Sequence, residues 1–188
     1  LKHVTHGAKI VLISHLGRPK GVDKNLSLLP VSKKLSKLLE KPVIFLNDCI
    51  GENIESSIKS GVPGDIFLLE NLRFYKEETK GDYSFSKKLS RLADVYINDA
   101  FGTSHRAHAS THGVVEHFQD EKYCGLLLEK EIINLNKVFN QNNSPSVAII
   151  GGAKISSKID VLFSLMNCVD KIIIGGGMAY TFIRALGG

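Results

Sequence analysis

The chain has 188 residues, of which 43% are hydrophobic and 23% are charged, and its formal net charge at pH 7 is +5. That length allows one large domain or one and a half ordinary ones, and the composition is typical of a globular protein. The mild positive charge favours anionic partners, whereas an aromatic content of 7% without tryptophan argues against a nucleic-acid-binding platform.

Apolar runs that predict strands alternate along the chain with segments of helical period. We expect helices at residues 31–39 (with Pro30 in the first turn), 83–93, 126–139 and 155–166. Most strand candidates are continuous apolar runs, which is typical of parallel strands buried on both faces. This alternation predicts a doubly wound α/β fold. The strands are expected at residues 9–14, 42–46, 65–70, 95–99, 147–150 and 171–174.

The first strand is followed at once by the segment 14–19, which contains His15, Gly17 and Arg18. Ligands of open α/β sheets bind at the carboxyl ends of the strands, and an arginine there suits a carboxylate or a phosphate. The alternative is a surface turn with an incidental arginine. Segments 69–74 and 98–108 repeat the pattern of strand, loop and arginine, and they favour an anion site.

A second candidate anion site follows the strand at residues 147–150. Gly151 and Gly152 precede an expected helix, whose free N–H groups attract anions, and Lys154 and Lys158 would share one helix face. The alternative is a glycine turn followed by solvated lysines. The sequence contains no Walker A motif, and the glycines at 175–177 lack the third glycine of a dinucleotide fingerprint, which argues against a dehydrogenase.

The chain offers little sign of a metal site. Four histidines cluster between residues 105 and 117, but no cysteine or carboxylate lies near them at zinc-ligand spacing. His105 and His108 flank Arg106, so we interpret them as donors to a phosphate or as groups that orient the arginine. The three cysteines form no C-x-x-C pair and indicate reduced thiols. No apolar run approaches the roughly 18 residues of a membrane span and no signal peptide is evident, so we expect a cytoplasmic protein.

Five motifs in one order along the chain resemble those of the phosphoglycerate kinase family. They are Ser14-His15-Leu16-Gly17-Arg18-Pro19, Glu70-Asn71-Leu72-Arg73-Phe74, the segment from Asn98 to His108, Gly151-Gly152-Ala153-Lys154, and Gly175-Gly176-Gly177-Met178-Ala179. The resemblance implies two Rossmann-like domains with parallel sheets and helices on both faces. It divides this chain into a triose-phosphate-binding domain without its first strand at residues 1–127, an interdomain helix and linker at 128–144, and the beginning of a nucleotide-binding domain at 145–188.

The resemblance also implies an activity and its residues. The activity is reversible phosphoryl transfer between ATP and 3-phosphoglycerate, giving ADP and 1,3-bisphosphoglycerate, by a cytoplasmic monomer. Mg²⁺ would arrive with the nucleotide, and its protein ligands would lie outside this chain. Arg18 and Lys154 would be catalytic. The substrate-binding residues would be His15, Leu16, Gly17, Arg18, Arg73 and Arg106, and the nucleotide-binding residues Gly152, Ala153, Lys154, Lys158, Gly176 and Gly177.

The extent of the chain leaves two hypotheses. The sequence begins with Leu1 rather than methionine and stops at Gly188 just after a helix pattern starts, so we expect it to be an internal segment of a kinase. The alternative is a truncated, non-catalytic anion-binding module. A helix and two strands after residue 144 cannot bury a stable second core, which disfavours that alternative. We expect the 188-residue chain alone to be inactive.

Overall fold

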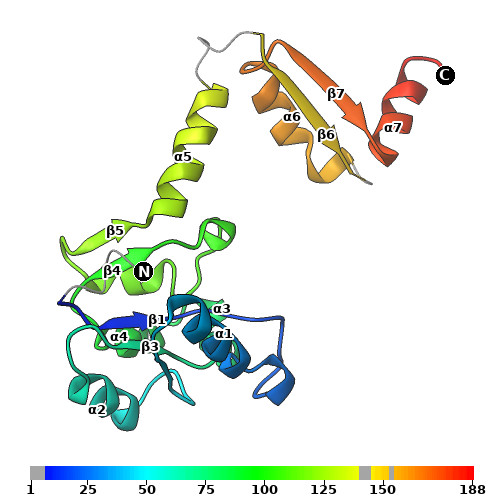
Figure 1. Ribbon diagram of the computed structural model, residues 1–188. Coiled ribbons are helices and arrows are strands. Elements are labelled where there is room, and N and C mark those ends of the chain that lie inside the picture. The colour runs from blue at the N-terminus through cyan, green and yellow to red at the C-terminus, as the bar shows by residue number, and fades with distance from the viewer. Residues whose placement is uncertain (1–6, 140–144, 153–154) are drawn as a thin grey trace. The chain divides into compact units, whose positions relative to one another are not determined.

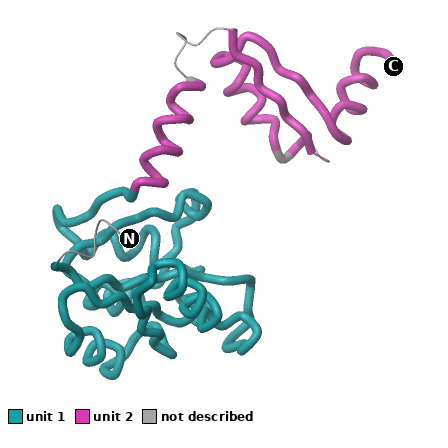
Figure 2. The backbone as a smooth tube through the Cα atoms, viewed as in Figure 1, with its two compact units in different colours: residues 1–125 teal, residues 126–188 magenta. Residues whose placement is uncertain are grey.

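The computed structural model describes residues 7–139, 145–152 and 155–188 (Figure 1). The chain divides into two compact units, residues 1–125 and 126–188 (Figure 2). Each unit is built from parallel strands and helices, which confirms the predicted α/β class. The predicted linker at residues 140–144 lies outside the described residues.

The first unit contains two parallel sheets. Strands β1 (Ile10–Leu12), β3 (Ile66–Leu68) and β2 (Val43–Phe45) form one sheet in the order β1-β3-β2, and β4 (Tyr96–Asn98) pairs with β5 (Lys122–Cys124). The helices of this unit are α1 (Leu29–Leu39), α2 (Glu52–Ser60), α3 (Lys76–Lys80) and α4 (Tyr83–Ser90). Short 3-10 turns cover Lys24–Leu26, Leu72–Phe74, Phe101–Thr103 and Gly113–His117.

Strand β3 is the centre of this unit, because all three of its residues are buried. Phe67 packs on one face with a cluster that includes Leu72 and Phe85. Ile66 and Leu68 pack on the other face with Leu28, at the start of α1. Burial on both faces matches the continuous apolar run in the sequence. Since a buried strand holds its neighbours in register, β3 fixes the loops that follow β1 and β3 at one edge of the sheet.

The second unit begins with α5 (Leu126–Phe139). It continues with β6 (Val147–Gly151), a 3-10 turn at Ile155–Ser157, α6 (Ile159–Met166), β7 (Lys171–Gly175) and α7 (Gly177–Ala185). Strands β6 and β7 are parallel, with Ile150 opposite Ile174. Ile150 packs against Leu162 of α6 and Met178 of α7.

The expectation that most strands are buried on both faces is wrong outside β3. Strand β1 is half-buried throughout, and exposed and less exposed residues alternate along β6 and β7. Val147, Ile149 and Ile173 are 53%, 77% and 53% exposed. The physical reason is that helices α6 and α7 contribute to a cluster on the opposite face of this two-stranded sheet. Within the part of the chain that the structure describes, no helix combines the length and the apolar character needed to cross a bilayer.

Candidate functional site

The loops after β1 and β3 are joined by the side chain of Asn71, which is completely buried. Its Nδ2 donates to the carbonyl oxygens of Leu16 (2.8 Å) and Leu26 (2.9 Å). Its Oδ1 accepts from the backbone N–H groups of Leu16 (3.2 Å) and Arg73 (3.1 Å). A single amide therefore fixes the backbone of three segments that are distant in the sequence, two of which contain predicted substrate-binding residues.

Arg73 lies across the loop that follows β1. Its Nη1 donates to the carbonyl oxygen of Gly17 at 2.6 Å. Gly17 has a φ of +65°, which a side chain rarely adopts, and a Cβ there would lie 3.0 Å from the Leu26 side chain. Arg73 Nε is buried and has no hydrogen-bond partner within the described part of the chain. A buried donor of this kind is suited to an incoming anion.

The predicted cationic residues of this unit lie close enough to perturb one another. Burial lowers the pKa of His15, and Arg73, His108 and Arg106 lower it further. Burial also lowers the pKa of Arg73, with contributions in the same direction from Arg106 and Arg18. We call His15, Arg18, Arg73, Arg106 and His108 the cationic cluster. It combines residues from three loops, as the repeated pattern of strand, loop and arginine predicts.

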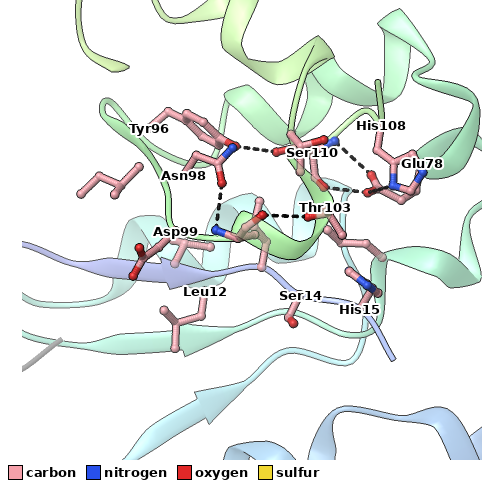
Figure 3. A pocket seen from close by; sticks show the side chains of 16 residues that line it. Leu12, Ser14, His15, Glu78, Tyr96, Asn98, Asp99, Thr103, His108 and Ser110 are labelled. Atoms are coloured by element: carbon pink, nitrogen blue, oxygen red, sulfur yellow. Dashed lines mark hydrogen bonds and ion pairs between the residues drawn. The ribbon is translucent and has the colours of Figure 1, made fainter. Parts of the chain in front are cut away.

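A cavity of about 320 Å³ lies between the ends of β1 and β4 (Figure 3). Its lining includes Ser14 and His15 after β1, Asn98 at the end of β4, and Glu78 and His108. The cavity therefore joins two members of the cationic cluster to polar groups that can donate or accept hydrogen bonds. Among the described residues, no group of three or more histidine, cysteine or acidic side chains could hold a metal ion.

Sequence reasoning missed the buried carboxylate of Glu78, which is 1% exposed. Its Oε1 accepts from the Ser110 hydroxyl (2.6 Å), and its Oε2 accepts from the Ser110 N–H (3.0 Å). The Nδ1 atom of His108 lies 3.8 Å from Oε1. Tyr96 of β4 donates its hydroxyl to the Ser110 carbonyl oxygen at 2.8 Å, and burial raises the pKa of Tyr96 to about 12. Glu78 follows another glutamate in a short polar stretch, so nothing in the sequence marks it as buried.

In the second unit, the predicted nucleotide-binding residues fall into two groups. Ala153 and Lys154 lie outside the described residues, so only their neighbours can be placed. Gly152 accepts from Met178 N–H at 2.9 Å, and Gly176, with a φ of +65°, approaches Gly152 so closely that a Cβ would lie 3.1 Å from its nitrogen. Two glycine turns are thus in backbone contact, and α7 begins directly after them at Gly177.

The spacing of Lys154 and Lys158 predicts that both lie on one face of a helix. For Lys158 this prediction is wrong. A 3-10 turn occupies Ile155–Ser157, and Lys158 is the N-cap residue of α6, which begins only at Ile159. The Lys158 ammonium donates to the carbonyl oxygen of Gly151 at 2.7 Å, at the end of β6. It therefore lies beside the glycine turn, and this bond uses one of the three N–H groups of its ammonium.

Comparison with known proteins identifies relatives over the whole chain. The family model described as "Phosphoglycerate kinase" matches residues 1–188. A phosphoglycerate kinase of Dictyoglomus turgidum is 56% identical over 181 residues, which are 96% of this chain and 45% of that protein. One from Clostridium botulinum (strain Loch Maree) is 53% identical over 184 residues, which are 96% of this chain and 46% of that protein.

Solved structures give the same result. The phosphoglycerate kinase structure from Coxiella burnetii matches with a TM-score of 0.81 and 39% identity, covering 95% of this chain and 44% of its own. That from Pyrococcus horikoshii matches with a TM-score of 0.83 and 32% identity, covering 97% of this chain and 46% of its own. The chain spans about half the length of the curated relatives it matches.

Proposed function

This chain belongs to the phosphoglycerate kinase family, and on that premise we propose that the protein containing it transfers a phosphoryl group reversibly between ATP and 3-phosphoglycerate. The products are ADP and 1,3-bisphosphoglycerate. The observation that carries the proposal is the cationic cluster, which brings His15, Arg73 and Arg106 together from separate loops. An acceptor with a phosphate and a carboxylate needs such a set of converging donors.

We assign the first unit to the triose phosphate. His15, Arg18, Arg73 and Arg106 bind its anionic groups, and the backbone at Leu16 and Gly17 shapes the loop around them. The buried Nε of Arg73 supports this assignment, because a phosphate oxygen would satisfy it. The acceptor carboxylate is already nucleophilic, so the reaction needs no general base. The chemical task of these residues is to position the acceptor and to neutralise negative charge.

We assign the second unit to the nucleotide. The glycine turns at Gly152, Gly176 and Gly177 allow the close approach of backbone to a ligand, and the Lys158 ammonium beside them supports phosphate binding. Ala153 and Lys154 complete this assignment, with Lys154 and Arg18 neutralising charge on the phosphoryl group in transfer. Mg²⁺ enters bound to the nucleotide phosphates as part of the substrate, and no residue of this chain is assigned to it.

The domain assignment is part of the same proposal. Residues 1–127 form the triose-phosphate-binding domain, residues 128–144 connect the domains, and residue 145 begins the nucleotide-binding domain. From membership of the family we also propose that the protein is a cytoplasmic monomer that acts on small molecules.

The test is steady-state kinetics of the full-length protein with ATP and 3-phosphoglycerate. Arg73→Ala removes charge-assisted bonds to the acceptor, so we expect it to raise KM for 3-phosphoglycerate about tenfold or more and to leave KM for ATP nearly unchanged. Arg91→Ala, at an exposed arginine at the end of α4, is the matched control and should change neither value. A larger effect of Arg73→Ala on ATP would refute the assignment of the two units.

A second experiment separates the kinase from the anion-binding module. The isolated 188-residue chain should show no turnover, because it spans about half the length of its relatives. Robust ATP-dependent phosphorylation of 3-phosphoglycerate by that chain would contradict the proposal that both complete domains are needed. Absence of activity in the full-length protein would refute the proposed function itself.

A further inference from the structure

Glu78 places a buried negative charge beside a cluster of cationic groups. Its side chain is 1% exposed, and it lines the same cavity as His15 and His108 (Figure 3). A carboxylate in that position repels any anion that binds there. Burial of a carboxylate also costs free energy unless hydrogen bonds and cations compensate for the lost water. Repulsion of the anion weakens binding, and burial of the carboxylate lowers stability. The residues that Glu78 bonds should therefore explain why a glutamate is present here.

Glu78 holds the segment of chain that carries His108. The carboxylate accepts two hydrogen bonds from Ser110, one to each oxygen, at 2.6 and 3.0 Å. The Glu78 carbonyl oxygen accepts from Ala109 N–H at 2.8 Å. Three hydrogen bonds thus attach residues 109 and 110 to α3. His108 immediately precedes this anchored pair, and its side chain is only 9% exposed.

The imidazole of His108 is the member of the cationic cluster that lies against Glu78. Its Nδ1 is 3.8 Å from Glu78 Oε1. The charged and titratable groups that act on this ring are Glu78 of α3, Arg73 after β3, and His105 and Arg106 after β4, and the ring in turn acts on His15 after β1. Since Nδ1 is on the side of the carboxylate, Nε2 remains for a ligand in the cluster.

We propose that Glu78 is a positioning residue, which fixes the imidazole of His108 through Nδ1 so that Nε2 is directed at the anion bound by Arg73 and Arg106. The inference rests on the proposed function, because it takes that anion to be the triose phosphate. The 3.8 Å separation is longer than a hydrogen bond. The proposed role requires it to shorten to one when the ligand binds. The carboxylate then balances the charge of a protonated His108, which donates through Nε2 to the ligand.

The first test is a double-mutant cycle in the full-length protein, read from the KM values of the two substrates. Glu78→Gln and His108→Gln should each raise KM for 3-phosphoglycerate roughly five- to tenfold, and KM for ATP should stay within about twofold. The double variant should be no worse than His108→Gln alone, because Glu78 acts through His108. Glu77→Gln, at the exposed neighbour in α3, is the matched control and should leave both values unchanged.

A purely structural role for Glu78 gives a different pattern. In that case Glu78→Gln lowers the melting temperature and alters KM by the same factor with or without His108, and this result would overturn the proposal. A wild-type protein without activity on 3-phosphoglycerate would instead refute the proposed function. The two failures are therefore distinguishable in one set of assays.

A second measurement needs no substitution of Glu78. It therefore tests the proposal even if the Glu78→Gln variant does not fold. Nitrogen-15 NMR of histidine-labelled wild-type protein reports which ring nitrogen carries the proton, and the signal of His108 is assigned by its loss in His108→Gln. We expect the neutral ring to carry its proton on Nδ1, where the carboxylate accepts it. A neutral ring protonated on Nε2 alone would overturn the proposal, because Nδ1 could then donate nothing to Glu78.

Discussion

Replacement of Asn71 by alanine should loosen the site without touching any predicted substrate-binding side chain. The Asn71 side chain makes four hydrogen bonds to the backbone of Leu16, Leu26 and Arg73. At about 1 kcal/mol for each bond, the whole set contributes about 4 kcal/mol to the free energy of unfolding. Leu16 is 41% exposed, so water replaces part of what its backbone loses. We therefore expect Asn71→Ala to cost about 3 kcal/mol.

Hydrogen exchange of the full-length protein measures this effect where it occurs. The amides of Leu69 and Leu72 donate to the carbonyl oxygens of Leu12 (3.0 Å) and Ser14 (3.2 Å), and so join the segments that follow β3 and β1. A loss of about 3 kcal/mol corresponds to exchange about a hundredfold faster at these amides. The loop after β1 should lose its fixed position too, which raises KM for 3-phosphoglycerate.

Asn71→Asp tests the same reasoning with a side chain of the same shape. It keeps both accepted bonds but replaces the amide donor with an oxygen that faces the carbonyl oxygens of Leu16 and Leu26. We expect it to be at least as destabilising as Asn71→Ala. Asn53→Ala, at an exposed asparagine in α2, is the control and should leave exchange unchanged. Exchange at Leu69 and Leu72 that is unaffected in Asn71→Ala, or an Asn71→Asp variant as stable as wild type, would refute the argument.

Two further predictions concern stability. Gly81→Ala should lower the free energy of unfolding by about 2–4 kcal/mol, because Gly81 has a φ of +66° and a Cβ there would lie 2.5 Å from the Ala107 carbonyl oxygen. Thermal melts should show this loss. The control is Gly21→Ala, where a Cβ meets nothing within 4 Å, and it should change the melting temperature little. Burial, helped by neighbouring arginines, lowers the pKa values of His15 and His108, although Glu78 opposes the shift at His108. The folded state therefore binds fewer protons than the unfolded state, and stability present above about pH 6.5 is lost as the pH falls through the lowered pKa values. The drop in melting temperature between pH 7.5 and 5.5 should be smaller in the double variant His15→Gln/His108→Gln; an equal drop would contradict the prediction.

The sequence predicts strands best where burial is on both sides. Residues 66–68 read as a continuous apolar run, and β3 is the fully buried strand. Strand β5 was not predicted, because Lys122-Tyr123-Cys124 is short, polar and exposed, and it is a strand only through its pairing with β4. Helix α2 was also missed, because only Ile54 and Ile58 face the core from a polar segment. Elements that depend on a partner leave little trace in their own composition.

The residues of the candidate site likewise fall into those that the sequence predicts and those whose roles depend on the fold. Arginines after strand ends are visible in the sequence, and parallel strands bring their carboxyl ends to one edge, so Arg73 and His15 could be grouped before the structure was known. The roles of the buried Asn71 and Glu78 could not be predicted, because they depend on bonds to residues 32 to 55 positions away. Only the fold determines which of several polar side chains in a loop is enclosed.

Those two buried side chains explain how an anion site can exist before its anion arrives. Cations held close together repel. Burial lowers the pKa of Arg73, and repulsion by Arg106 and Arg18 lowers it further, while Glu78 acts in the opposite direction. A carboxylate bonded to each arginine would relieve the repulsion, but it would also neutralise the site. Arg73 instead donates to the neutral carbonyl oxygen of Gly17, and the neutral amide of Asn71 holds that loop in place. Glu78 accepts its hydrogen bonds from Ser110. Arg73 is therefore restrained by uncharged groups, while the Glu78 carboxylate is taken up by Ser110 and His108, which leaves the charge of the arginine available for the substrate.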